Sequence, residues 1–214
     1  QGGISAVIKD CDEGDSTDLH FKDTMEAGNM INKSEAVRVL VEEARDNIDN
    51  IINMGVKFDS INGRILLTRE GGHSKKRILH CGGDATGNHV TKLLYSRISD
   101  RSNIRVMNNV FLCDILTKGE NAIGVVVLDS KDRPIIIYAK KIVLATGGVG
   151  RVFRNSTNAG CITGDGIAAA MRANVEVTDM EFVQFHPTAM VHPSETGRYF
   201  LISEAVRGEG GILR

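Results

Sequence analysis

The feature that most constrains the fold is an apolar run that ends in glycines. Ile142–Ala145 is entirely apolar and passes directly into Thr146-Gly147-Gly148. A continuous apolar strand is typical of a parallel sheet that is buried on both faces. Glycine lacks a Cβ, so the turn after the strand allows the backbone to approach a ligand closely. This pattern predicts an α/β nucleotide-binding architecture.

Two more glycine clusters support that prediction. Gln1-Gly2-Gly3 precedes an apolar segment, and Thr163-Gly164-Asp165-Gly166 opens a predicted helix. A helix N-terminus favours negative charge and therefore suits a phosphate group. Each cluster alone is better explained as a structural turn. Together they favour a dinucleotide, although the G-x-G-x-x-G fingerprint is absent from this chain.

Periodicity predicts the other elements. Apolar residues recur at helical spacing in several segments, with Ser34 and Thr86 as expected N-caps. The predicted helices cover 17–31, 88–98 and 165–173, and a further helix starts at Ser34 and ends before Gly55. Three β-rich runs with short polar connections, 110–117, 123–129 and 134–138, predict an antiparallel meander. Further short strands are expected at 56–58, 65–68, 104–107 and 175–178.

Composition excludes several classes of protein. The chain has 214 residues, 42% hydrophobic residues and a net charge of −1, which argues against a globally basic nucleic-acid binder and against a disordered chain. No uninterrupted apolar stretch is long enough for a membrane span. Its 4 cysteines form no C-x-x-C pair, so we expect neither a disulfide framework nor a metal site. A reducing cytoplasm is the simplest setting.

Polar side chains concentrate in two places. Residues 68–87 are rich in Gly, His and charge, which indicates a functional loop or simply a solvated one; Lys75-Lys76-Arg77 within it is expected to be solvated or to line a substrate-access rim. Near the end, Phe185-His186-Pro187-Thr188 is followed by Ser203, Glu204 and Arg207. Glu204 and Arg207 are three residues apart, which permits either a functional pair or an ordinary surface ion pair.

Five motifs, in this order, resemble the flavoprotein family of succinate dehydrogenase, fumarate reductase and L-aspartate oxidase. They are QGG at 1–3, ATGG at 145–148, TGDG at 163–166, EFVQFHPT at 181–188 and SEAVRGEGG at 203–211. The resemblance covers essentially the whole chain. Within the family, TREGGHSKKRILH at 68–80 and DATG at 84–87 are most similar to the L-aspartate oxidases.

The resemblance implies an α/β fold in two parts. Residues 1–178 are expected to form a FAD-binding Rossmann-like domain with an inserted antiparallel β-meander. Residues 179–214 are expected to begin an α+β capping domain. The family's first strand and its G-x-G-x-x-G loop are missing, so we expect an internal piece of a longer chain.

The resemblance also implies an activity. It implies noncovalent FAD and oxidation of L-aspartate to iminoaspartate, with O₂ or fumarate as electron acceptor, as the first step of de novo NAD biosynthesis. Quinolinate synthase is the partner that consumes the product, and neither nucleic acid nor membrane is expected. Two alternatives stay open: a fumarate reductase or succinate dehydrogenase flavoprotein, and a piece that is not catalytic by itself.

Residue roles follow from the resemblance by position. Gln1, Gly2 and Gly3 are expected to approach the flavin and its phosphates, Thr146 and Gly147 to lie under the FAD, and Asp165 to contact it.

The same resemblance gives the substrate side of the site. His186 and Ser203 are expected to hydrogen-bond a substrate carboxylate, while Glu204 and Arg207 match a pair associated with substrate binding and proton transfer. Glu70 is the candidate for distinguishing aspartate from succinate, because its charge attracts an ammonium group.

Overall fold

The computed structural model describes residues 2–9, 12–83, 85–186, 188–193, 199–202, 206 and 210–212. These residues fall into two compact units. One contains the described parts of Gln1–Arg105 and Ser203–Arg214, and the other is Val106–Ile202. The domain boundary expected after residue 178 concerns a different division of the chain and stays a prediction.

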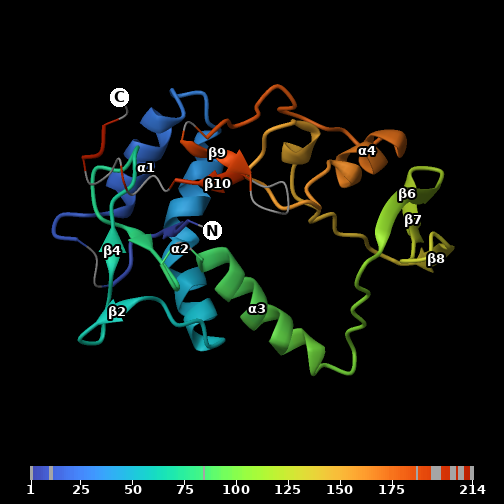
Figure 1. Ribbon diagram of the computed structural model, residues 1–214, viewed down its shortest axis with the longest axis horizontal. Coiled ribbons are helices and arrows are strands. Elements are labelled where there is room, and N and C mark those ends of the chain that lie inside the picture. Colours follow the sequence, from blue (N-terminus) through green and yellow to red (C-terminus); the bar gives the residue numbers. More distant parts are fainter. Residues whose placement is uncertain are drawn as a thin grey trace. The chain divides into compact units, whose positions relative to one another are not determined.

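Two packed helices form one side of the first unit (Figure 1). Helix α1 (Thr17–Ala27) begins after Ser16, whose Oγ accepts a hydrogen bond of 3.1 Å from the backbone N–H of Leu19. Such a cap satisfies one of the backbone donors that a helix start leaves unpaired. Helix α2 (Ser34–Asn53) is amphipathic, and its buried positions Val37, Val41 and Ile48 fall on one face.

Both N-cap predictions were wrong. Ser34 is the first helical residue of α2, and the cap position is Lys33, which makes no side-chain cap bond. Helix α3 (Thr86–Ser99) likewise begins at Thr86 rather than after it. The Thr86 hydroxyl instead accepts a hydrogen bond of 3.0 Å from the backbone N–H of Cys81. Its role is therefore to hold the preceding loop.

Short antiparallel strands complete the first unit. Strand β5 (Ile78–Leu79) lies between β1 (Ile4–Ser5) and β4 (Leu67–Thr68). Strands β2 (Ser60–Ile61) and β3 (Arg64–Ile65) form a hairpin. Asn62 and Gly63 form the turn between these strands, and both have positive φ, the geometry that a tight hairpin requires.

The core of the first unit joins these strands to α2. Its buried members are Ala6, Ile8, Ile48, Val56, Phe58, Leu79 and Cys81. The segment 56–58 contributes two of these residues, but the strand predicted there is not formed. Its apolar side chains are buried in the core although its backbone pairs with no strand.

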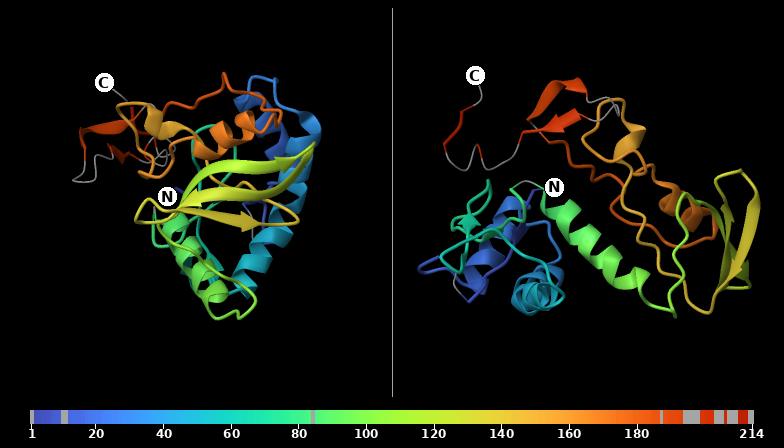
Figure 2. Two further views of the ribbon diagram at one scale, coloured as in Figure 1. Left: turned by 90° about the vertical axis from the view of Figure 1, so that its right-hand side faces the viewer. Right: turned by 60° about the horizontal axis from the view of Figure 1, so that its bottom comes forward.

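The predicted meander is confirmed in the second unit. Strands β6 (Phe111–Lys118), β7 (Asn121–Leu128) and β8 (Pro134–Tyr138) form an antiparallel sheet in sequence order, seen face-on in the left view of Figure 2. Helix α4 (Asp165–Arg172) packs on β6, and its Arg172 donates to the Asp114 carboxylate at 2.5 Å and to the Cys113 carbonyl.

The second unit also contains shorter elements. These are the 3₁₀ turn η1 (Gly150–Val152) and the antiparallel pair β9 (Ala189–Pro193) and β10 (Tyr199–Leu201). Among the described residues, no helix combines the length and apolarity that a bilayer-spanning segment requires.

Three further predicted strands are absent from the described structure. Residues 104–107, 142–145 and 175–178 are extended or irregular, and Val143 is 88% exposed. A strand exists only when a neighbour satisfies its backbone donors and acceptors. No described strand pairs with these segments, and the four described sheets are antiparallel. The buried parallel sheet expected from the apolar run is therefore not found in the described residues.

Candidate functional site

Gly2 and Gly3 lie near the start of the first unit, and Gly3 packs against strand β5. Gly2 has a positive φ of 72° and bridges to Ala85, while its Cβ position faces open space. A Cβ added to Gly3 would overlap the Ile78 side chain and would lie 3.0 Å from Cε1 of His80. The backbone at Gly3 therefore lies directly against His80, and only glycine fits there.

Glu70 lies near the same histidine. Its Oε1 is 3.9 Å from Nε2 of His80, and the two side chains are 20% and 12% exposed. Nε2 of His80 is also 2.8 Å from the Thr68 hydroxyl, and Nδ1 is 3.2 Å from the Gly83 carbonyl. His80 thus links the proposed flavin-facing glycines to the proposed specificity residue. Neither His80 nor Thr68 was among the predicted site residues.

Asp59 holds the turn that follows His80. Its carboxylate accepts 2.9 Å hydrogen bonds from the backbone N–H groups of both Gly82 and Gly83. The bond from Gly83, with that from Gly82, lowers the pKa of the Asp59 carboxyl despite partial burial. Both glycines have positive φ, which explains why this turn requires them.

The second unit brings together three predicted cofactor residues. The turn that contains Thr146 and Gly147 packs on the turn that starts α4, because a Cβ added to Gly166 would overlap the Thr146 side chain. Gly147 has a φ of 73°. Asp165, at the first position of α4, accepts a 2.5 Å hydrogen bond from the Thr163 hydroxyl.

His186 is fixed by its neighbour Thr188. The Thr188 backbone N–H lies 3.2 Å from Nδ1 of His186, and the Thr188 carbonyl lies 3.0 Å from the same nitrogen. The Thr188 hydroxyl donates to the Ile202 carbonyl at 3.1 Å, which connects this segment to the end of β10. The imidazole is thereby held in one orientation by the sequence that follows it.

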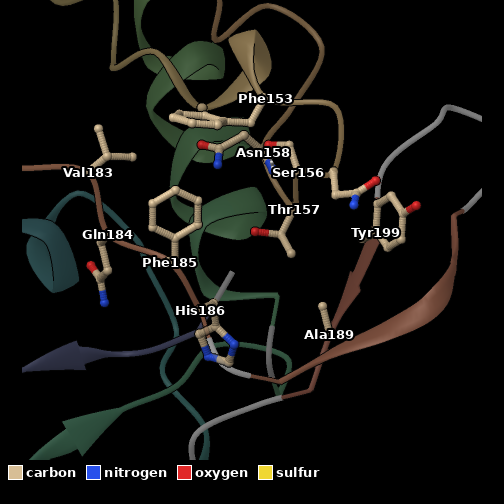
Figure 3. A pocket seen from close by; sticks show the side chains of 12 residues that line it. Phe153, Ser156, Thr157, Asn158, Val183, Gln184, Phe185, His186, Ala189 and Tyr199 are labelled. Atoms are coloured by element: carbon tan, nitrogen blue, oxygen red, sulfur yellow. Dashed lines mark hydrogen bonds between the residues drawn. The ribbon is translucent and has the colours of Figure 1, made fainter.

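A pocket of about 230 Å³ opens beside His186 (Figure 3). Phe153 and Phe185 form an edge-to-face pair in its wall, with ring centroids 5.2 Å apart. Polar residues also line the pocket; they include Asn155, Ser156, Thr157, Asn158, Gln184 and His186. Apolar walls with a few polar groups are typical of small-molecule sites. The sequence analysis identified His186 here but missed the wall supplied by 153–158.

The remaining predicted residues lie outside the described part of the chain. These are Gln1, Ser203, Glu204 and Arg207. The structure therefore places Gly2, Gly3 and Glu70 in the first unit. It places Thr146, Gly147, Asp165 and His186 in the second. Within the described residues, no group of His, Cys, Asp and Glu side chains is arranged to hold a metal ion.

The described residues fit FAD in each unit. At Gly3 and Gly147 the chain offers side-chain-free backbone, and the Cβ positions of Gly2 and Gly148 face open space. The Asp165 carboxylate carries only acceptor oxygens, which suit sugar hydroxyl groups better than phosphate. Close backbone approach combined with a hydroxyl acceptor matches a cofactor that carries both a flat ring and a polyhydroxylated chain.

Comparison with known families identifies the class. A sequence model of the FAD binding domain matches residues 1–214, and the chain belongs to that family. FAD is therefore its cofactor. The resemblance expected from the five motifs is confirmed at this level.

Several curated relatives are L-aspartate oxidases. The chain is 43% identical to that of Streptomyces coelicolor over 220 residues, covering 100% of this chain and 37% of the relative. It is 42% identical to that of Clostridium acetobutylicum and 44% identical to that of Neisseria meningitidis, covering 100% of this chain in both cases and 48% and 42% of the relatives. The chain thus spans less than half the length of these relatives.

Solved structures of related enzymes share the fold. A mutant of the Escherichia coli quinol fumarate reductase matches with a TM-score of 0.87 at 32% identity, covering 98% of this chain and 34% of that chain. Mycobacterium smegmatis Sdh1 in complex with UQ1 matches with a TM-score of 0.84 at 32% identity, covering 97% of this chain and 37% of that chain.

Proposed function

We propose that this chain is part of a flavoenzyme that oxidises L-aspartate to iminoaspartate, with O₂ or fumarate as electron acceptor. The observation that carries the proposal is the position of Glu70, a largely buried carboxylate beside His80, which itself lies against Gly3. The similarity of residues 1–214 to part of the L-aspartate oxidases supports it. FAD supplies the redox chemistry when bound, while the chain binds and orients both molecules.

Substrate selection rests on charge in this proposal. Aspartate and succinate are both four-carbon dicarboxylates, and aspartate differs by an ammonium group. A carboxylate at Glu70 attracts that ammonium, whereas succinate presents only a CH₂ group there. Low local polarity strengthens the attraction, because Glu70 is only 20% exposed.

The other residues take complementary roles. Gln1, Gly2, Gly3, Thr146, Gly147 and Asp165 hold the cofactor. His186 and Ser203 hydrogen-bond a substrate carboxylate, and Glu204 and Arg207 bind substrate and move a proton.

The proposal extends to architecture and pathway. Residues 1–178 belong to a Rossmann-like FAD-binding domain into which the β6–β8 meander is inserted, and residues 179–214 begin a capping domain. The product enters NAD biosynthesis through quinolinate synthase in the cytoplasm.

The deciding experiment uses the FAD-loaded protein at its full natural length. We expect aspartate to reduce the flavin and to yield hydrogen peroxide in air or succinate when fumarate is supplied. Succinate itself should reduce the flavin much more slowly. The reverse preference would favour the second candidate, a fumarate reductase or succinate dehydrogenase flavoprotein, which the structural relatives support.

A further inference from the structure

A buried ionic cluster lies beneath the loop that carries Glu70. Arg77 has no exposed side-chain surface, and its guanidinium donates to both oxygens of Asp15 at 2.6 and 3.1 Å. A third donor, Nη1, contacts Asp23 at 2.5 Å. The prediction that this arginine lies in a solvated segment was wrong, because two carboxylates from another part of the chain neutralise it in the interior.

The cluster joins two segments of the first unit along their length. Asp23 accepts hydrogen bonds of 2.8 and 2.7 Å from the backbone N–H and the hydroxyl of Ser74. The backbone N–H of Lys76 donates to Asp12 at 3.2 Å, and the Lys75 ammonium donates to the Glu13 carbonyl at 2.6 Å. The second half of the 69–77 loop is thus tied to 12–15 and to α1.

Two histidines complete the cluster without adding charge. Nδ1 of His73 lies 3.3 Å from Nη1 of Arg77, and the His73 ring lies 5.6 Å from that of His20. Burial, followed by the charge of Arg77, lowers the pKa of His20 to about 4 and also lowers that of His73. Both rings are neutral near pH 7, so the charged members are one arginine and two aspartates.

Contacts within the loop transmit this anchoring to Glu70. The Glu70 carbonyl accepts a 3.2 Å hydrogen bond from the backbone N–H of His73, whose ring contacts Arg77. The backbone N–H of Arg77 donates to the Thr68 carbonyl at 3.1 Å, which closes the loop at its base. Glu70 therefore lies between two points that Arg77 holds.

We propose that Arg77 is a positioning residue for substrate selection, because its bonds to Asp15, Asp23 and the loop backbone fix the carboxylate of Glu70 where an ammonium-bearing dicarboxylate must bind. The inference rests on the proposed function, and it adds a residue that holds Glu70 in position.

Energetics support positioning over simple stabilisation. Buried ion pairs contribute little net stability, because the loss of hydration offsets the attraction between the charges. A fork-shaped guanidinium does, however, fix geometry through several bonds at once. Lysine retains the charge but offers a single donor centre, so Arg77→Lys separates charge from geometry.

The test compares two cluster variants with two controls in the FAD-loaded protein at its full natural length. Arg77→Lys removes the fork. Ser74→Ala removes one bond to Asp23 from an exposed residue and keeps the test available if Arg77→Lys does not fold. Arg38→Lys changes the exposed pair with Asp18 on the helices, and Ser96→Ala removes an exposed hydroxyl bond on α3.

We expect both cluster variants to raise the KM for aspartate about tenfold, with kcat and fumarate reduction within about twofold. Amide hydrogen exchange at residues 69–73 should accelerate in both variants without substrate. Both controls should leave these quantities unchanged. Equal losses with aspartate and fumarate, or unchanged aspartate kinetics despite lower thermal stability, would overturn the inference.

The two proposals fail separately. If the unmodified protein does not oxidise aspartate, the proposed function is wrong, and unchanged exchange at 69–73 would then also reject the positioning role. If Glu70→Gln selectively weakens aspartate oxidation but neither cluster variant does, the function stands and the positioning role of Arg77 is wrong.

Discussion

Nε2 of His80 lies 2.8 Å from the hydroxyl of Thr68 and 3.9 Å from Oε1 of Glu70. Thr68 is the last residue of β4, and His80 directly follows β5, the strand that pairs with β4, so the sheet constrains their separation. Gly3 packs on the same imidazole, so a substitution at Gly3 or Thr68 would displace His80 and, through it, Glu70. Four predictions test the roles of this region and of its supporting core.

Glu70→Gln should weaken aspartate oxidation far more than fumarate reduction. The amide keeps the size of the side chain but removes the charge that attracts the ammonium group. Loss of a hydrogen bond to a charged group is worth about 1.5–3 kcal/mol, or roughly 10- to 150-fold in kcat/KM. Steady-state kinetics with both substrates measure the ratio, and Glu26→Gln on the exposed face of α1 is the matched control. Equal losses in the two reactions would remove the specificity role of Glu70.

Gly3→Ala should impair FAD binding and destabilise the first unit. The new methyl group would overlap Ile78 and lie 2.9 Å from the backbone carbonyl of Leu79, so the strand must shift. Overpacking of this kind typically costs about 1–3 kcal/mol. Flavin titration by fluorescence and thermal unfolding report the two effects. Gly160→Ala, at an exposed position with no atom within 4 Å of the added Cβ, should behave as the parent protein.

Stability should fall as pH is lowered from about 6.5 to about 4. His20 has a pKa near 4 in the fold, against 6.5 in a solvated chain, mainly because it is buried. Between these values the unfolded chain binds the additional proton, so acid favours unfolding by up to about 3 kcal/mol. His73 acts in the same direction.

Thermal unfolding across this pH range, with His20→Gln as the test variant, checks the sign and the source. The variant should show a flatter pH dependence than the parent protein, whereas His89→Gln on exposed α3 should not. An unchanged slope in His20→Gln would show that other groups dominate the acid sensitivity.

Leu79→Ala should destabilise the first unit by about 2–5 kcal/mol, because the leucine has no exposed surface and the substitution leaves a cavity in the core. Leu40→Ala removes the same atoms from a side chain that is 60% exposed, and it should change stability by less than about 0.5 kcal/mol. Denaturant titrations of both variants make the comparison. Similar values for the two would contradict the assigned core.

Local signals predicted the elements that are stable through short-range contacts. Short polar connections between β-rich runs predicted the meander, and strands β6, β7 and β8 form it. Helices α1, α2 and α4 follow from spacing, although both predicted caps were wrong, because propensity at a helix start does not say which residue occupies the cap.

Long-range relationships were not predictable in the same way. The run Ile142–Ala145 carries a strand pattern, but a strand needs a partner that its own sequence does not specify. Arg77 follows two lysines in the sequence, a pattern that predicts a solvated segment. Only the fold shows that Arg77 pairs with Asp15 and Asp23. His80 and Asp59 were missed as site residues for the same reason, since their importance depends on which backbone they contact.

The span of the Arg77–Asp15 pair also bears on how the chain folds. The two residues are 62 positions apart, so α1, α2 and the hairpin must all be made before the pair can close. At roughly 5–20 residues per second, synthesis leaves Asp15 and Asp23 without their cation for about 3–12 s or slightly less. During that interval the nascent first unit carries two carboxylates destined for its interior, and the arrival of Arg77 is the step that commits them to burial.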